Sequence, residues 1–401
     1  MNLKAGLPYW LIKDGLPFDY PRLEKNIETD VLIMGGGISG AITAYYLMRA
    51  GINCVVVDSR SIGLGSTCAS TSLLQYEIDV SLCDLKNKIG LAAAVDAYRL
   101  CGDAIGKLYE IATTVGFHDF SFKKSLYYAA DRKHVSFLKD ECKLRHENDF
   151  DVQFLEKEII EKEFGFKAPA AILSGLAAVT DAYGLTHSIH QHNLKNGCEV
   201  YQRTFIKHID HKKDGVKLIT DNKISIKAKK LIYANGYEAV NYISKKIVDL
   251  TSTFATAAET GTAHQDGWRD DLIIWNTATP YLYMRSTNDG RIIVGGRDEK
   301  FYNPEKRDKL IGSKSSQLKK DFNSVFPRIE FNPEFNWTGV FGSTKDGLPF
   351  IGPYKKLTNS YFALGFGGNG ITFSVIAAEI ITDMILGKTR SDTKLFGFER
   401  A

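Results

Sequence analysis

One carboxylate and three glycines near the start of the chain form the pattern with the clearest chemical meaning. Gly35, Gly37 and Gly40 have the spacing G-x-G-x-x-G, and Asp58 lies 18 residues after the last of them. The first glycine permits a tight turn, the second lets backbone approach a pyrophosphate, and the third lets a helix pack on a strand. A carboxylate at this distance accepts hydrogen bonds from a ribose diol. The pattern therefore predicts a dinucleotide site, and its acid argues against the 2′-phosphate of NADP.

The residues around the glycines predict the elements that would hold such a site. Residues 30–34 and 53–57 are short apolar runs typical of buried parallel strands, and Asp58 ends the second. Between them, apolar residues recur at helical spacing until Gly51. The N–H groups and dipole at the start of this helix, around Ile38 and Ser39, would face the phosphates.

Two further segments rich in small residues favour the same interpretation. The loop from Ser59 to Gln75 contains many Gly, Ser and Thr residues, and loops of this kind lie at the carboxyl ends of strands, where ligands bind. Residues 364–370 are glycine-rich and open a predicted helix over 371–386, whose N-terminus would also suit an anion. The alternatives are a flexible surface loop and a plain C-terminal helix packed on the core.

The pattern along the rest of the chain indicates mixed helices and strands. Residues 1–28 read as an irregular arm laid over the surface, and 280–285 with 291–295 as a hairpin around Asp289 and Gly290. Other expected helices are 80–116, 131–148, 155–164 and 181–195, and other expected strands are 122–129, 198–203, 205–208, 216–220, 224–228 and 231–234.

A metal site is not expected. His187, His190 and His192 are close in sequence, but on a helix positions 190 and 192 point to different sides. No cysteine pair or carboxylate at ligand spacing completes a set.

Length and composition bound the possibilities. At 401 residues, two domains are expected, and 44% hydrophobic with 24% charged residues is ordinary for a globular protein. The net charge of +4 and the lack of a basic stripe argue against nucleic acid. The six cysteines have no metal spacing and are expected to be reduced thiols in a cytoplasmic protein. Residues 1–21 do not resemble a signal peptide, and no apolar run reaches the ~18 residues of a membrane span.

Together these features resemble the FAD-dependent amine and amino-acid oxidoreductases, a family that includes glycine oxidase, D-amino-acid oxidase, sarcosine oxidase and the gamma-glutamylputrescine oxidase group. The likeness spans nearly the whole chain. It rests on the segments 30–40, 66–74, 231–236 and 281–295 and, most specifically, on G-S-T-K-D-G-L-P-F-I-G at 342–352 and on 365–374.

The resemblance implies an α/β fold with a discontinuous Rossmann-type FAD-binding domain and an α+β substrate domain built on an antiparallel sheet. The FAD-binding domain would comprise 24–90, 181–246 and 334–401. The substrate domain would comprise 91–180 and 247–333, and residues 1–23 would form the N-terminal arm.

The resemblance also implies which residues bind FAD. Asp58 would hold the adenosine ribose, and Ile206 would lie by the adenine. The last helix would aim its N-terminus at the flavin N1–C2=O edge, where a positive dipole favours negative charge. The full set of expected cofactor residues is Gly35, Gly37, Ile38, Ser39, Gly40, Asp58, Ser59, Ser66, Thr67, Ser72, Leu73, Ile206, Gly368, Asn369, Gly370, Ile371 and Thr372.

Departures from the family pattern bear on the substrate. Phe341 and Gly368 stand where arginines would hold a substrate carboxylate, so a small amino acid is a doubtful substrate. Ile293 stands where sarcosine oxidase has its oxygen-activating lysine, which leaves O2 or another carrier open as electron acceptor. Gly339 replaces the flavin-linking cysteine, so FAD is expected to be non-covalent.

The hairpin supplies the candidate substrate residues Tyr281, Tyr283 and Arg285, which share one face of a strand and could contact substrate or only pack. No catalytic base is evident. Hydride transfer from a neutral amine to flavin N5 does not need one, because the protein then has only to orient and desolvate. The sequence thus predicts an enzyme that oxidises a C–N bond of an amine or amino-acid derivative. The alternatives are an NAD-dependent dehydrogenase and a flavoprotein without amine turnover.

Overall fold

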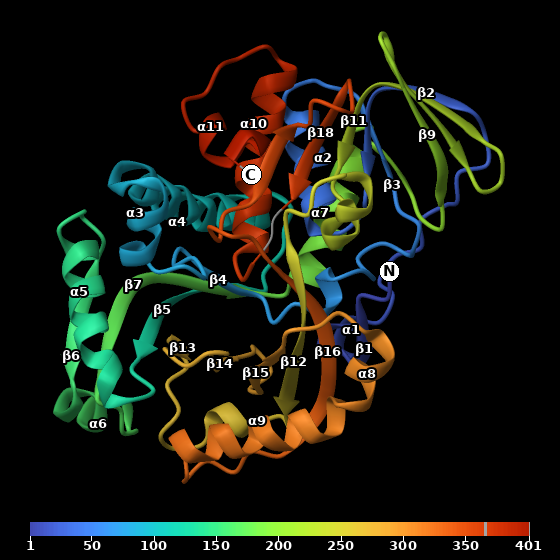
Figure 1. Ribbon diagram of the computed structural model, residues 1–401. Coiled ribbons are helices and arrows are strands. Elements are labelled where there is room, and N and C mark those ends of the chain that lie inside the picture. The colour runs from blue at the N-terminus through green and yellow to red at the C-terminus, as the bar shows by residue number, and fades with distance from the viewer. Residues whose placement is uncertain (365–366, 401) are drawn as a thin grey trace.

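The computed structural model describes residues 1–364 and 367–400, and two sheets organise them (Figure 1). Gly365 and Phe366, which belong to the glycine-rich segment before the last helix, lie outside the described residues. One sheet carries the dinucleotide fingerprint. The other is largely antiparallel and lies below it in Figure 1.

The first sheet is parallel at its centre and confirms the Rossmann-type expectation. Its strand order is β17-β18-β11-β2-β3-β8, with an antiparallel ribbon of β9 and β10 joined to β11. Leu32 and Met34 face one hydrophobic cluster and Val31 and Ile33 face another, because a parallel sheet is covered on both sides. The strands are β2 (Ile27–Met34), β3 (Cys54–Val57), β8 (Glu199–Tyr201), β9 (Ile206–Lys212), β10 (Gly215–Thr220), β11 (Ser225–Tyr233), β17 (Phe350–Pro353) and β18 (Ser360–Leu364).

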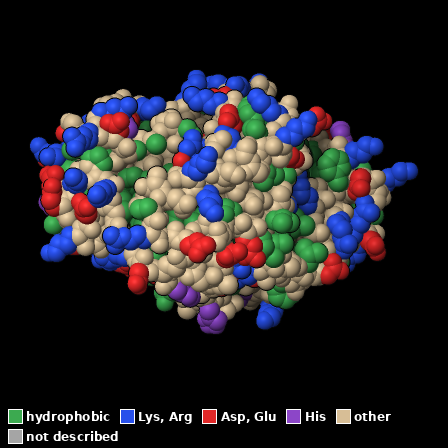
Figure 2. Space-filling model, turned by 90° about the horizontal axis from the view of Figure 1, so that it is seen from below, with side chains coloured by type: hydrophobic (Ala, Val, Ile, Leu, Met, Phe, Trp, Pro, Cys, Tyr) green, Lys and Arg blue, Asp and Glu red, His purple; other side chains and the backbone are tan. Residues whose placement is uncertain are grey.

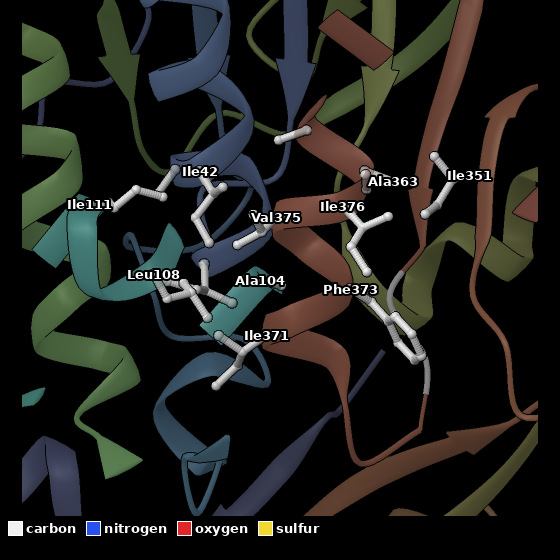
Figure 3. Packing of buried hydrophobic residues seen from close by; sticks show 14 of the residues in the cluster. Ile42, Ala104, Leu108, Ile111, Ile351, Ala363, Ile371, Phe373, Val375 and Ile376 are labelled. Atoms are coloured by element: carbon white, nitrogen blue, oxygen red, sulfur yellow. The ribbon is translucent and has the colours of Figure 1, made fainter. Parts of the chain in front are cut away.

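Four helices pack against one another beside this sheet. They are α2 (Ile38–Arg49), α4 (Leu91–Thr114), α7 (Ala182–Lys195) and α10 (Gly370–Ile385). Figure 3 shows Ile42 of α2, Leu108 of α4 and Val375 of α10 converging on one apolar cluster. This packing fixes the N-termini of α2 and α10, which belong to opposite ends of the chain, at the same region of the molecule.

The second sheet has the order β1-β16-β12-β15-β14-β13-β5-β7-β4, with β6 paired to β7. Figure 1 shows α9 running beneath the end of the sheet that carries β12 and β16, and residues of α9 contact both strands. The strands are β1 (Lys4–Gly6), β4 (Leu73–Gln75), β5 (Phe120–Tyr128), β6 (Val152–Glu156), β7 (Ala170–Thr180), β12 (Asp249–Ala258), β13 (Leu272–Asn276), β14 (Tyr283–Ser286), β15 (Ile292–Glu299) and β16 (Pro333–Ser343). The remaining helices are α1 (Tyr9–Asp14), α3 (Leu82–Ile89), α5 (Val135–His146), α6 (Lys157–Phe164), α8 (Pro304–Lys309), α9 (Ile311–Val325) and α11 (Thr393–Phe396).

Some elements differ from their sequence-based expectation. The arm is not purely irregular and superficial, because β1 joins the edge of the antiparallel sheet and Trp10 of α1 is only 1% exposed. Residues 224–228 and 231–234 belong to one strand, β11, since pairing with β2 continues along its whole length. The expected helix at 155–164 begins as β6. β7 was not predicted, because its run of Ala, Gly and Ser lacks clear alternation.

The domain boundaries remain a proposal. β4 and the larger part of β16 fall within segments proposed for the FAD-binding domain, yet both strands pair in the antiparallel sheet. These two strands therefore lie where the proposed domains meet.

The surface seen from below the antiparallel sheet carries both kinds of charge (Figure 2). Lys and Arg side chains lie among Asp and Glu side chains across this face. That mixture does not form the basic stripe typical of a nucleic-acid interface.

Candidate functional site

A cavity of about 540 Å³ is lined by residues of both sheets. Volumes of this order are typical of sites for small molecules and cofactors. The structure brings most of the predicted site residues into its lining: Gly35, Gly37, Ile38, Ser39, Asp58, Ser59, Ser66, Thr67, Ser72, Leu73, Ile206, Tyr281, Tyr283, Phe341, Gly368, Gly370 and Ile371.

The glycine turn between β2 and α2 is closed so tightly that side chains do not fit. A Cβ atom on Gly40 would lie 1.8 Å from the carbonyl oxygen of Gly35, and Gly35 itself has φ +120°. A Cβ on Gly37 would lie 2.7 Å from Oγ1 of Thr67. That hydroxyl accepts a hydrogen bond from the backbone N–H of Ile38 at 3.1 Å. Gly40 supports the turn from behind and does not line the cavity.

Asp58 is held at the end of β3 by two backbone donors. The N–H of Gly36 donates to Oδ2 at 2.7 Å, and the N–H of Arg60 donates to Oδ1 at 2.8 Å. Burial raises the pKa of Asp58, while these hydrogen bonds act in the opposite direction. The guanidinium of Arg60 donates to Glu238, also in the lining, at 2.7 and 2.9 Å.

Polar atoms in the lining lack partners within the described part of the chain. Oγ of Ser66 and Oδ1 of Asn235 are buried without a hydrogen bond, and both residues border the cavity beside the glycine turn. Buried polar groups are normally satisfied, so these atoms point to a polar ligand. Together with a turn that admits backbone only, they fit the pyrophosphate and ribose portions of FAD.

The N-terminus of α10 also borders the cavity. Gly370 and Ile371 line the cavity, whereas Asn369 and Thr372 shape the helix start from behind. The side-chain amide of Asn369 donates to the carbonyl of Gln75 at 2.8 Å. Thr372 donates through Oγ1 to the carbonyl of Asn369 at 2.9 Å. The backbone at the start of this helix therefore borders the cavity, and its first N–H groups have no partner within the helix.

The far end of the cavity is aromatic and acidic. Tyr281 and Tyr283 have ring centroids 5.7 Å apart, and the hydroxyl of Tyr281 donates to Oδ1 of Asp79 at 3.2 Å. Oδ2 of Asp79 accepts from the N–H of Gly368 at 2.8 Å. Asp298 lines the same region.

Arg285 does not occupy the place expected of a substrate contact. Its side chain is fully buried and donates to the carbonyls of Ser72 at 3.0 Å and Thr180 at 2.8 Å. Although it shares a strand face with Tyr283, it lies outside the cavity lining, and its guanidinium bonds to backbone just before β4 and at the end of β7. The structure thus assigns Arg285 to holding the segment that carries Ser72.

Several residues at the site were not predicted from the sequence. Asp79, Asp298 and Glu238 come from segments without a motif, and Asn235 lies in the segment 231–236, where no role was expected of it. His190 lies in α7, and its Nε2 is 3.1 Å from the carbonyl oxygen of Gly36, next to the glycine turn. Burial lowers the pKa of His190 to about 3, so its imidazole is neutral and donates to that carbonyl.

Comparison with known proteins supports the same interpretation. Gamma-glutamylputrescine oxidoreductase of Escherichia coli (strain K12) is 24% identical over 404 aligned residues, which cover 92% of this chain and 86% of that protein. Glycine oxidase of Bacillus subtilis (strain 168) is 22% identical, covering 92% of this chain and 96% of the relative. The crystal structure of L-proline dehydrogenase from P. horikoshii shares the fold with a TM-score of 0.78 at 18% identity, covering 94% of this chain and 99% of that one.

A family model provides the direct assignment. The model described as FAD dependent oxidoreductase matches residues 30–384, from the first strand of the fingerprint to α10. That span includes the glycine turn, Asp58 and the N-terminus of α10. The chain therefore belongs to the FAD dependent oxidoreductase family.

Proposed function

We propose that this protein oxidises a C–N bond of an amine or amino-acid derivative, with FAD bound non-covalently. One observation carries the proposal: a single cavity extends from the glycine turn and Asp58 to the tyrosines of the hairpin. A cofactor held at the first end would present its reactive part to a substrate held at the second. The family match favours FAD over the NAD alternative.

Residues from both ends of the chain would hold FAD. The turn around Gly37 with the N-terminus of α2 would face the pyrophosphate, and Asp58 would accept hydrogen bonds from the ribose. The N-terminus of α10 would face the flavin. When bound, FAD supplies the two-electron acceptor for the oxidation.

The protein's own part in the reaction is to orient the substrate and to exclude water. Tyr281 and Tyr283 form an apolar wall with polar tips at the far end of the cavity. Among the described lining residues, Arg60 is the one lysine or arginine, and its guanidinium is engaged by Glu238 at the nucleotide end.

The absence of a cation at the far end, within the described lining, bears on the substrate. A carboxylate adjacent to the reacting carbon would be desolvated without a partner, at a cost of roughly several kcal/mol. Phe341 lines the cavity at one position where an arginine is expected from the resemblance. We therefore propose a secondary or larger primary amine whose charged groups lie away from the oxidised bond.

The relatives' names are consistent with a nitrogen-containing substrate, since they include an oxidoreductase of gamma-glutamylputrescine and a glycine oxidase. We propose O2 or another electron carrier as the acceptor. No helix in the described residues is long and apolar enough to cross a bilayer. All six cysteines are unpaired, which supports a reducing, cytoplasmic location.

Two measurements test the proposal. The purified protein should be yellow, and acid precipitation should leave the colour in the supernatant; a yellow pellet would contradict non-covalent binding. Anaerobic stopped-flow mixing with a panel of amines and amino acids should then bleach the flavin. Failure of every compound would favour a flavoprotein without amine turnover. Faster reduction by glycine or D-alanine than by all larger amines would contradict the proposed substrate class.

A further inference from the structure

Two carboxylates from distant parts of the chain lie at the far end of the cavity, Asp298 in its lining and the exposed Asp79 bonded to two lining residues. Asp79 follows β4 and is bonded to Tyr281 and Gly368, two residues of the cavity lining. Asp298 lies in β15 and lines the cavity itself. Burial raises the pKa of the Tyr281 phenol, and the negative charges of Asp79 and Asp298 raise it further.

Neither carboxylate has a cationic partner within the described residues. Among the described residues, no lysine, arginine or histidine forms an ion pair with Asp79 or Asp298. Lys314 lowers the pKa of Asp298 through its charge, but its ammonium donates to Glu299 at 2.5 Å. Oδ1 of Asp298 is buried and has no hydrogen-bond partner, although the residue borders an open cavity. Buried charges are normally paired, so this oxygen points to a ligand that donates to it.

Aromatic rings surround the carboxylates. Tyr281 lies between Trp275, with centroids 6.1 Å apart, and Tyr283. A Cβ on Gly295 would lie 2.2 Å from Cζ of the Tyr283 ring, so glycine there makes room for this ring. Tyrosine faces with nearby carboxylates attract organic cations.

The absence of a side chain at Gly368 leaves room for the carboxylate of Asp79 and the phenol of Tyr281. A Cβ there would lie 2.8 Å from Oδ1 of Asp79 and 3.3 Å from the hydroxyl of Tyr281. A longer side chain, such as the arginine expected at this position from the resemblance, would displace Asp79. The space next to the helix start therefore has a carboxylate and a phenol in place of a cation.

We propose that the substrate is an amine with a second cationic group, and that Asp298 and Asp79, together with the faces of Tyr281 and Tyr283, bind this second group. This inference rests on the proposed amine oxidation and specifies its substrate class as diamines and related dications. The reacting nitrogen must lose its proton before hydride transfer, and a nearby carboxylate pair would hold that proton in place. The carboxylates are therefore better suited to bind the second cationic group, which keeps its charge throughout the reaction.

Three probes of matched length test the proposal: N-methylbutylamine, N-methyl-1,4-diaminobutane and 5-(methylamino)pentanoate. Their dissociation constants are measured at pH 8 by calorimetry under anaerobic conditions. The diamine should bind at least about tenfold more tightly than the monoamine, the effect of one charge-assisted hydrogen bond, and the carboxylate probe should bind most weakly.

Variants assign the effect to the carboxylates. Asp298→Asn should bring the ratio of diamine to monoamine affinity close to one, and Asp298→Glu should retain most of it. Asp79→Asn should lower the ratio, while the exposed Asp266→Asn should leave it unchanged. Equal binding of the diamine and the monoamine would overturn the proposal. Equal weakening of both by Asp298→Asn would also overturn it, because the carboxylates would then bind the reacting ammonium and not the second cationic group.

The outcomes separate this inference from the proposed function. Preferential diamine binding without flavin bleaching would support the cation site and contradict the oxidation. Bleaching by monoamines with no preference for the diamine would contradict the cation site and support the oxidation. If the protein carries no FAD, the same titrations on the protein alone apply, and failure to bind any of the three probes would overturn the cation site.

Discussion

The two ends of the cavity are built in opposite ways. The nucleotide end is made mainly of contiguous backbone, with Gly35, Gly37 and Gly40 in one turn and Asp58 at the end of the next strand. The far end is made of side chains brought together from the segment after β4, the hairpin strands and the start of α10. Backbone recognition suits the FAD after which the family is described, whereas side chains can change with the substrate. Substitutions at the two ends should therefore have different consequences.

The largest effect is expected at the nucleotide end from Gly40→Val. Its Cβ would lie 1.8 Å from the carbonyl oxygen of Gly35, which is backbone and cannot move aside without opening the turn. We expect loss of FAD from the purified protein, measured by flavin absorbance per protein. Gly106→Ala in α4 is a matched control, because nothing lies within 4 Å of its added Cβ and alanine favours a helix. FAD retention by Gly40→Val would contradict the tight closure of the turn.

The second prediction concerns Arg285, which sequence reasoning placed at the substrate. Replacement by Met would remove a donor from the buried carbonyl of Thr180 and one of two donors from the carbonyl of Ser72, which also accepts from the N–H of Thr180 at 3.3 Å. The free energy of unfolding should fall by about 2 kcal/mol, the cost of weakening the hydrogen bonding of buried acceptors, as measured by urea denaturation. The exposed Arg203→Met should have little effect. An unchanged unfolding midpoint with weakened amine binding would return Arg285 to the substrate site.

The contrast between the two ends explains what the sequence could predict. The turn, Asp58 and the loop carrying Ser66 are close in the chain, so spacing alone indicates their shared role. Asp79 and Asp298 are 219 residues apart and follow no motif, so only the paired strands reveal that they meet. Alternation along β14 correctly groups Tyr283 with Arg285, but it does not say where on that face the cavity ends.

The same limit applies to the fold. The strands with strong apolar runs, β2 and β3, lie within the predicted residues or extend them slightly. By contrast, β7 is rich in Ala, Gly and Ser, and its place between β4 and β5 follows from long-range pairing that no local pattern encodes. The charged start of β11 resembled a separate strand, because its lysines face solvent at one end of a sheet that is otherwise covered.

The third prediction tests the acidic character of the far end by varying the pH. Burial raises the pKa of Asp298 from 3.8 to about 6, the field of Asp79 adds to this effect, and Thr253 and Lys314 oppose it. The folded protein holds the Asp298 proton more tightly than the unfolded chain does, so this protonation stabilises the fold by on the order of 3 kcal/mol. The stabilisation is fully present below pH 4 and is lost as the pH rises through about 6.

Asp298→Asn removes this titration. The variant should therefore gain stability over the parent as the pH rises from 4 to 7, which thermal unfolding of the FAD-free protein at several pH values would measure. Asp266→Asn on the surface should show no such divergence. A stability difference that does not change with pH would mean that Asp298 titrates as an ordinary surface carboxylate.

The smallest effect is expected for Asp58→Ala, because the backbone of the turn remains in place. The carboxylate's charge-assisted hydrogen bonds to a ribose diol are worth about 1.5–3 kcal/mol, so the FAD dissociation constant should rise roughly ten- to a hundredfold. The substitution also removes the acceptor for the N–H groups of Gly36 and Arg60, which favours the upper part of that range. Asp30→Ala, in β2 but paired with Lys229 on the surface, is the matched control. Titration of the apoprotein with FAD measures both, and an unchanged constant for Asp58→Ala would remove this carboxylate from the cofactor site.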